Sequence, residues 1–178
     1  MANVPTYKVI VAGDGSVGKT SLLRRQTAGR FTASRVMTIG VEFHVDTIRV
    51  GRHTIKLSIW DIGGQKRFAG FRRMFYRGAV AGALVFDVTD RDTFIALPHW
   101  REEVLSIAPY ARLMVVGNKN DMPREIEYDE ARAWSLAMRC PYVEVSAMTG
   151  HAVDRIFEGL GWLAVKNTEQ LQPQAAAT

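Results

Sequence analysis

The chain has 178 residues, of which 47% are hydrophobic and 23% charged, the composition of a globular protein large enough to bury one core. The net charge of +5 is spread along the chain without interleaved aromatic residues on one face, so we expect no nucleic-acid partner. The single cysteine, Cys140, excludes an intrachain disulfide, and we expect a monomer in the reducing cytoplasm.

The ends of the sequence carry no recognisable membrane signal. No apolar run is long enough to span a bilayer, and the N-terminus lacks the pattern of a signal peptide. Ala2 excludes N-myristoylation, and the last residues contain no cysteine that prenylation requires. We therefore expect no lipid anchor in this sequence.

Short apolar runs alternate with helical patterns, which favours an α/β fold with a mainly parallel sheet. Residues 41–50 and 54–60 predict a hairpin that supplies an antiparallel edge. The other predicted strands are 8–12, 83–88, 112–117 and 142–146, and the predicted helices are 19–28, 67–77, 93–108, 129–139 and 151–167. Pro98 either opens the regular part of its helix or kinks it. The predicted organisation is an N-terminal tail (1–6), one domain (7–167) and a flexible C-terminal tail (168–178).

A glycine-rich loop, residues 13–20, precedes the first helix and fits the pattern G-x-x-x-x-G-K-[ST] between a strand and a helix. In that context, backbone N–H groups and the helix N-terminus bind phosphate oxygens. Lys19 is expected to reach the outer phosphates and the Thr20 hydroxyl a magnesium ion. The residues predicted to surround the phosphates are Gly13, Asp14, Gly15, Ser16, Val17, Gly18, Lys19, Thr20 and Ser21.

Two loops that follow later strands predict recognition of guanine. Asn118, Lys119 and Asp121 follow the strand 112–117, and ligands gather at the carboxyl ends of parallel strands. A buried Asp121 would accept two hydrogen bonds from guanine, and adenine lacks that donor pair. Asn118 would hold the base or the phosphate loop, and the stem of Lys119 would lie along the ring. The second loop, which would complete the base site through the N–H of Ala147, contains Ser146, Ala147 and Met148.

Five motifs in this order resemble those of small GTPases of the Ras superfamily, most of all the Rab branch, over about residues 7–167. The motifs are residues 13–20, Thr38 within 38–43, 61–65, 118–121 and 146–147. The resemblance implies a P-loop NTPase small G domain, a six-stranded mainly parallel sheet with one antiparallel edge strand and about five helices. It also implies a switch that hydrolyses GTP to GDP with Mg²⁺.

The resemblance assigns roles to residues in the two switches, about 31–43 and 61–77, which would signal to effectors under a GAP and a nucleotide-exchange factor. Thr38 would bind Mg²⁺ and the γ-phosphate, and Asp61 would reach the metal through water. The Gly64 N–H would contact the γ-phosphate, and Gln65 would orient the attacking water. The implied sets are Lys19, Thr38 and Gln65 for catalysis, Thr20, Thr38 and Asp61 for the metal, and Phe31 for an edge-on contact with guanine.

Two groups of side chains leave alternatives open. Phe43, Trp60 and Phe75 match an aromatic triad that Rab proteins present beside their switches, but plain core packing explains them equally well. A basic cluster on the second switch either faces an acidic partner or is a solvated helix face, which we expect. It consists of Arg67, Arg72 and Arg73.

Several positions depart from the Rab pattern. Gly15 and Ser16 stand in the opposite order, and residues 61–65 are closer to Arf and Gα proteins. Lys66 replaces a glutamate, and Met148 replaces a lysine, which predicts looser packing beside the base and faster nucleotide exchange.

Arg35 lies three residues before Thr38, at the spacing at which Gα subunits carry their built-in arginine finger. We hypothesise that Arg35 stabilises developing charge on the γ-phosphate without a GAP. The alternative is a solvated loop arginine or an effector contact.

Two other functions compete with a GTP-hydrolysing switch. One is a guanine-nucleotide-dependent interaction module with negligible catalysis, which the presence of Thr38 and Gln65 disfavours. The other is a P-loop kinase or ATPase, which Asp121 disfavours. The four histidines have no metal-ligand spacing.

Overall fold

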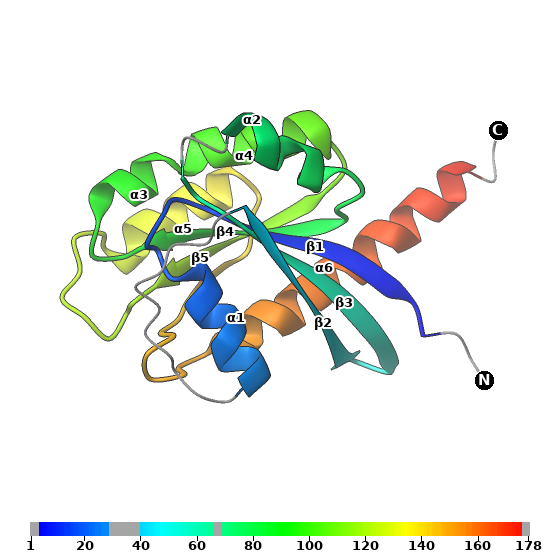
Figure 1. Ribbon diagram of the computed structural model, residues 1–178, viewed down its shortest axis with the longest axis horizontal. Helices are drawn as coiled ribbons and strands as arrows, with labels where there is room; N and C mark the ends of the chain where they lie inside the picture. Colours follow the sequence, from blue (N-terminus) through cyan, green and yellow to red (C-terminus); the bar gives the residue numbers. More distant parts are fainter. Residues whose placement is uncertain (1–3, 29–39, 66–68, 176–178) are drawn as a thin grey trace.

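A twisted sheet runs through the computed structural model, which describes residues 4–28, 40–65 and 69–175 (Figure 1). Over these residues the sheet has six strands in the order β2-β3-β1-β4-β5-β6. Only the β2–β3 pair is antiparallel among the described pairs, so the predicted mainly parallel sheet with an antiparallel edge is confirmed. The strands are β1 (Thr6–Ala12), β2 (Val41–Val50), β3 (His53–Ile62), β4 (Ala81–Asp87), β5 (Arg112–Asn118) and β6 (Tyr142–Glu144).

Helices cover both faces of the sheet (Figure 1). β1 shows why: Val9 and Val11 face one buried cluster with α1 and α6, whereas Ile10 and Ala12 face a second cluster with α3, α4 and α5. This alternation is what a central strand buried on both faces requires. The helices are α1 (Lys19–Ala28), α2 (Ala69–Arg72), the 3₁₀ helix η2 (Arg73–Tyr76), α3 (Arg91–Ile95), α4 (Leu97–Ile107), α5 (Tyr128–Ala137) and α6 (Val153–Ala175).

Three predicted helices differ from those observed. The helix predicted over 67–77 is the short α2 followed by η2, since Gly70 weakens the helix and a 3₁₀ turn is a common way to end one. The helix predicted over 93–108 is two helices, and Pro98 lies in the first turn of α4, where its missing N–H is harmless.

The predicted end of the last helix at Asn167 is wrong, because α6 continues to Ala175. Asn167 is buried, and its Nδ2 donates to the carbonyls of Val80 and Tyr110, both at 2.8 Å, so it attaches the helix to the segments that lead into β4 and β5. None of the helices in the described part of the chain has the length and apolarity to cross a membrane.

Candidate nucleotide-binding site

The phosphate loop passes so close to its neighbours that two glycines are required. A Cβ at Gly13 would lie 2.1 Å from the Val85 carbonyl oxygen, and one at Gly18 would lie 2.3 Å from Asn118 Nδ2. Gly18 also has φ +96°, which side chains disfavour. The loop is therefore pressed against the ends of β4 and β5, at the edge where parallel sheets bind ligands.

Lys19 lies beneath this loop with only 6% of its surface exposed. Its Nζ donates to the carbonyl oxygens of Gly13 at 2.8 Å and Asp14 at 2.7 Å. Burial lowers the pKa of Lys19 to about 8, and the carboxylates of Asp61 and Asp14 oppose this shift. The ammonium thus occupies the base of a loop whose N–H groups are suited to anions.

Asp61, near the end of β3, fits the predicted magnesium site. Its carboxylate is fully buried, Oδ2 accepts a hydrogen bond from the Thr20 hydroxyl, and Oδ1 has no partner among the described residues. Burial raises the pKa of Asp61, against the opposing effects of Lys19 and Thr20. A buried oxygen without a partner is unfavourable unless a cation or its water satisfies it.

The chemistry of these donors also fits Mg²⁺. Within the described ranges, no three His, Cys, Asp or Glu side chains are grouped to hold a metal by themselves. Mg²⁺ commonly takes one or two protein oxygens together with nucleotide phosphates and waters. Thr20 and Asp61 supply such oxygens next to the phosphate loop.

Asn118 joins the two loops that were predicted to hold the nucleotide. This residue is 1% exposed, its Nδ2 donates to the Val17 carbonyl at 2.8 Å, and its Oδ1 accepts the Ala147 N–H at 3.1 Å. Of the two alternatives for Asn118, the structure shows the hold on the phosphate loop. The Ala147 N–H already has a partner, so a bond to guanine would have to share or replace it.

The two other residues predicted to recognise guanine after β5, Lys119 and Asp121, differ in their surroundings. Lys119, with φ +67°, pairs through Nζ with Asp87, whose side chain is 7% exposed. Asp121 is exposed rather than buried and bonds no described residue. Burial of this carboxylate therefore depends on the base itself, and its contact with guanine stays a prediction.

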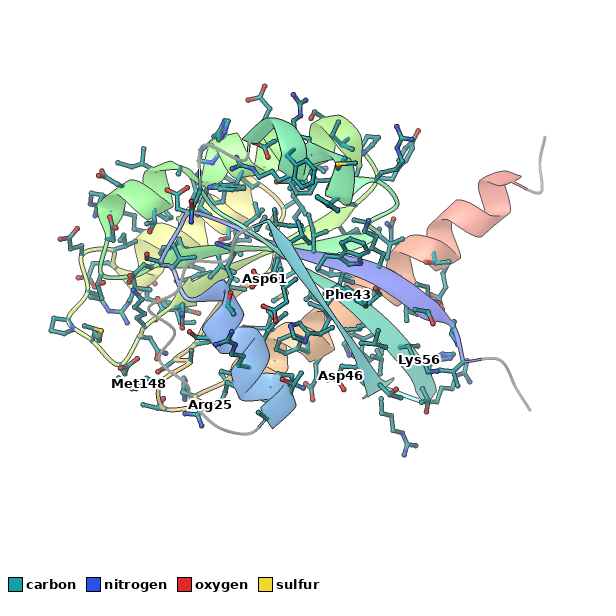
Figure 2. The ribbon with its side chains drawn as sticks, viewed as in Figure 1. Arg25, Phe43, Asp46, Lys56, Asp61 and Met148 are labelled. Atoms are coloured by element: carbon teal, nitrogen blue, oxygen red, sulfur yellow. The ribbon has the colours of Figure 1, made fainter. Side chains whose placement is uncertain are left out.

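Arg25 is a site residue that the sequence analysis missed. From the last turn of α1, its Nε donates to the Ala147 carbonyl at 2.9 Å and its Nη2 to the Met148 carbonyl (Figure 2). Ser146, fully buried, accepts the Thr149 N–H at 3.0 Å and closes the turn. No local sequence pattern relates Arg25 to a loop more than a hundred residues later.

Arg25→Ala is expected to release GDP several-fold faster than the unmodified chain, because the carbonyls of the 146–148 loop lose their guanidinium donor. The GTP hydrolysis rate should stay unchanged, since these two hydrogen bonds of Arg25 go to the 146–148 loop and not to the phosphate loop. Displacement of a fluorescent GDP analogue measures release, and Arg24→Ala on the same helix is the control. Equal release rates in both variants would contradict the role of Arg25.

The start of the second switch touches the phosphate loop directly. A Cβ at Gly64 would lie 2.4 Å from both the Gly13 carbonyl oxygen and the Asp14 carbonyl carbon. Gln65 follows and is half-buried. The predicted residues Phe31, Arg35, Thr38, Lys66 and Arg67 lie outside the described residues.

The aromatic triad forms a row across β2, β3 and η2. The ring centroids of Phe43 and Trp60 are 5.9 Å apart, and those of Trp60 and Phe75 are 5.8 Å apart. Phe43 is 63% exposed, whereas Trp60 and Phe75 are half-buried against the core. Both alternatives thus hold in part: the row rests on the core and shows Phe43 to solvent.

The expectation of a solvated face for the switch-II arginines is wrong for Arg72. Its side chain is 3% exposed and pairs with Glu103 of α4 at 2.7 Å. Arg73 is exposed, as expected. The α2–η2 surface turns Arg72 inward because it packs against α4, which a helical periodicity alone does not show.

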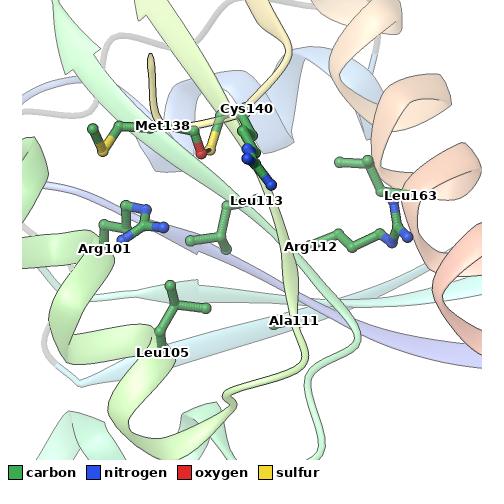
Figure 3. Close-up of a pocket in the computed structure, with 9 residues that line it drawn as sticks. Arg101, Leu105, Ala111, Arg112, Leu113, Met138, Cys140 and Leu163 are labelled. Atoms are coloured by element: carbon green, nitrogen blue, oxygen red, sulfur yellow. Dashed lines mark hydrogen bonds between the residues drawn. The ribbon is translucent and has the colours of Figure 1, made fainter. Parts of the chain in front are cut away.

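A separate hollow of about 200 Å³ lies near the start of β5, at the end of that strand opposite the phosphate loop (Figure 3). Leu105, Leu113 and Met138 contribute its apolar lining, and Cys140 lies beside them. Burial raises the pKa of the Cys140 thiol, against the opposing effect of Arg101, in agreement with a structural role for this cysteine.

Known proteins identify the family of this chain. The Ras family model matches residues 8–165. The chain belongs to the Ras family. Among its relatives, Ras-related protein Rab-11C of Dictyostelium discoideum is 37% identical over 86% of this chain and 70% of its own length. Ras-related protein Rab-30 of Homo sapiens is 35% identical over 92% and 82%, and Ras-related protein SEC4 of Saccharomyces cerevisiae is 38% identical over 84% and 71%.

This Ras-family chain is therefore a Rab-like small GTPase, and its fold is the small G domain. It binds GTP and GDP with Mg²⁺, hydrolyses GTP and acts as a switch through effectors. GAPs and exchange factors are the general regulators of this family.

Proposed function

We propose that this GTPase is a timed switch in which the residues predicted from the sequence perform the separate steps. Residues 13–21 hold the phosphates, and Asn118, Lys119 and Asp121 select guanine. Thr20, Thr38 and Asp61 hold Mg²⁺, which neutralises charge on the phosphates. The supporting observation is the buried Asp61 carboxylate, with Oδ1 unpartnered among described groups, beside Thr20 and the phosphate loop.

In this proposal Gln65 orients a water for attack on the γ-phosphorus, and the bond to the β-phosphate oxygen breaks to give GDP and phosphate. Gly64, which already lies against the phosphate loop, donates its N–H to the γ-phosphate. Loss of that phosphate removes the contacts of Thr38 and Gly64, so both switches relax. Effectors read the change beside Phe43 and its aromatic neighbours.

Gln65→Leu is expected to slow GTP hydrolysis at least tenfold while GTP affinity changes little, because leucine cannot orient a water. Addition of Mg²⁺ to GTP-loaded protein starts a single turnover, and released phosphate gives the rate. The matched control is Gln26→Leu, the same substitution at a glutamine that bonds Asp46 of β2 at 3.2 Å. A wild-type rate in Gln65→Leu would refute the proposed role of Gln65.

We further propose that Arg35 is a finger in cis, a proposal that rests on its position in the sequence. Arg35→Ala should lower partner-free GTP turnover around a hundredfold, near 2.7 kcal/mol of barrier, because a guanidinium would no longer meet the developing charge. Arg52→Ala, in the exposed β2–β3 turn, is the control. Unchanged turnover in Arg35→Ala would mean that Arg35 is a loop or effector residue.

We also propose that the protein acts as a monomer in the cytoplasm. The single cysteine suits a reducing compartment, and the exposed Phe43 of the aromatic row suits a partner that binds only one state of the switches. Light scattering of the GDP-bound and GTP-bound protein tests the monomer.

A further inference from the structure

A buried ion pair joins the second switch to α4. Arg72 Nε and Nη2 donate to the two carboxylate oxygens of Glu103, each at 2.7 Å. The hydroxyl of Tyr76, fully buried in η2, donates to Glu103 Oε1 at 2.7 Å. Burial alone would raise the pKa of Glu103, but the bonds from Arg72 and Tyr76 hold it below its usual value, so the pair is charged at neutral pH.

The same face of α4 holds the phosphate loop. Trp100, one turn before Glu103, donates its indole Nε1–H to Asp14 Oδ1 at 2.7 Å. The Arg72 guanidinium lies over the Trp100 ring, with Cζ 4.1 Å from the ring centroid, which adds a cation–π contact. Asp14 and Arg72 are thus both attached to one rigid helix.

Arg72 then reaches back to the residue proposed to orient the water. Its remaining terminal nitrogen, Nη1, donates to the Gln65 carbonyl at 3.3 Å. A guanidinium presents its donors in a fixed plane, so the bidentate bond to Glu103 also fixes the direction of Nη1. The Gln65 backbone is therefore located by α4, which in turn is bound to the phosphate loop.

The buried Arg72–Glu103 pair is not explained by a gain in folding stability. Buried ion pairs are often no more stabilising than apolar residues of similar volume, whereas a fixed arrangement is a use to which some proteins put them. Here the arrangement fixes two parts of one site: Gly64 lies on the phosphate loop and Gln65 on Arg72.

We propose that Arg72 is a positioning residue for GTP hydrolysis: with Glu103 and Trp100 of α4, it holds the Gln65 backbone at a set distance from the phosphate loop. The proposal rests on the role of Gln65 given above. It adds that the hydrolysis rate depends on α4. The two α4 residues involved, Trp100 and Glu103, form no described hydrogen bond to a side chain predicted to be catalytic. A shift of about 1 Å in a reacting group lowers a rate by up to about a hundredfold.

The test compares Arg72→Lys with Arg73→Lys. Lysine keeps the charge at position 72, but one ammonium cannot hold Glu103 bidentately and reach the Gln65 carbonyl as well. Arg73 is the matched control, because it lies next in the chain and bonds Ser106 of α4 at 3.1 Å without contacting Gln65. Each variant is measured for GTP and GDP affinity and for single-turnover hydrolysis, alone and combined with Gln65→Leu.

We expect Arg72→Lys to slow hydrolysis about tenfold, with nucleotide affinities within twofold of the unmodified chain and no further slowing in the Gln65→Leu background. Arg73→Lys should hydrolyse at the unmodified rate. Two results would overturn this inference and leave the proposed function intact. In the first, Arg72→Lys slows hydrolysis by the same factor in the unmodified chain and in the Gln65→Leu background. In the second, Arg72→Lys hydrolyses GTP at the unmodified rate while Gln65→Leu is slow. An unmodified rate in Gln65→Leu overturns the proposed function together with it. If Arg72→Lys does not fold, Glu103→Gln replaces it with the same expectations.

Discussion

Asp121→Ala is expected to lower the affinity for GDP about a thousandfold and to remove the preference for guanine over adenine. We propose that the Asp121 carboxylate accepts two hydrogen bonds from guanine, and charge-assisted bonds of this kind contribute about 1.5–3 kcal/mol each to binding. Adenine offers no such donor pair, so its weak binding should hardly change. Competition of GDP and ADP against a fluorescent nucleotide measures both affinities.

The control for this variant is Asp129→Ala, because Asp129 is an exposed carboxylate in the first turn of α5. Asp121 is exposed and bonds no described residue, so its removal should leave the thermal unfolding midpoint unchanged. Retained guanine preference in Asp121→Ala would show that another group reads the base.

Gly64→Ala is expected to slow GTP hydrolysis several hundredfold while GDP affinity stays within a few-fold of the unmodified value. An added methyl group would lie 2.4 Å from the backbone of the phosphate loop, so the second switch must move away. Gln65 then loses its alignment, and the Gly64 N–H loses its reach to the γ-phosphate. Single-turnover hydrolysis and GDP titration separate the two effects.

Gly70→Ala is the matched control, because a Cβ at Gly70 meets no atom of the described residues within 4 Å. Alanine also favours the helical conformation of α2, so this variant should be at least as stable as the unmodified chain. Hydrolysis at the normal rate in Gly64→Ala would mean that the second switch acts from a position other than the one described.

The sequence predicted the parts of the site that lie within single loops. The spacing of glycines and Lys19 defines the phosphate loop wherever it follows a strand and opens a helix, and Asn118 follows β5 in the same manner. The alternation of β2 and β3 likewise predicted their hairpin, and β2 has the predicted bounds. Such features depend on neighbours along the chain, which a single sequence contains.

Contacts between distant residues were beyond reach from one sequence. Three such contacts form only when the sheet brings distant segments together. They join Arg25 to the 146–148 loop, Trp100 to Asp14, and Arg72 to Glu103. An arginine on a short helix has the same local pattern whether it faces solvent or a buried glutamate. The 3₁₀ turn of η2 also escaped prediction, because packing rather than periodicity sets the direction of Tyr76.

The single amide of Asn118 has a consequence for how the nucleotide leaves. Its two ends bond Val17 and Ala147, so neither loop can move far without breaking a hydrogen bond that serves the other. An exchange factor that displaces residues 146–148 would therefore also weaken the binding of the phosphates by the phosphate loop. Base and phosphates should then dissociate in one concerted step, and GDP release should show a single exponential phase.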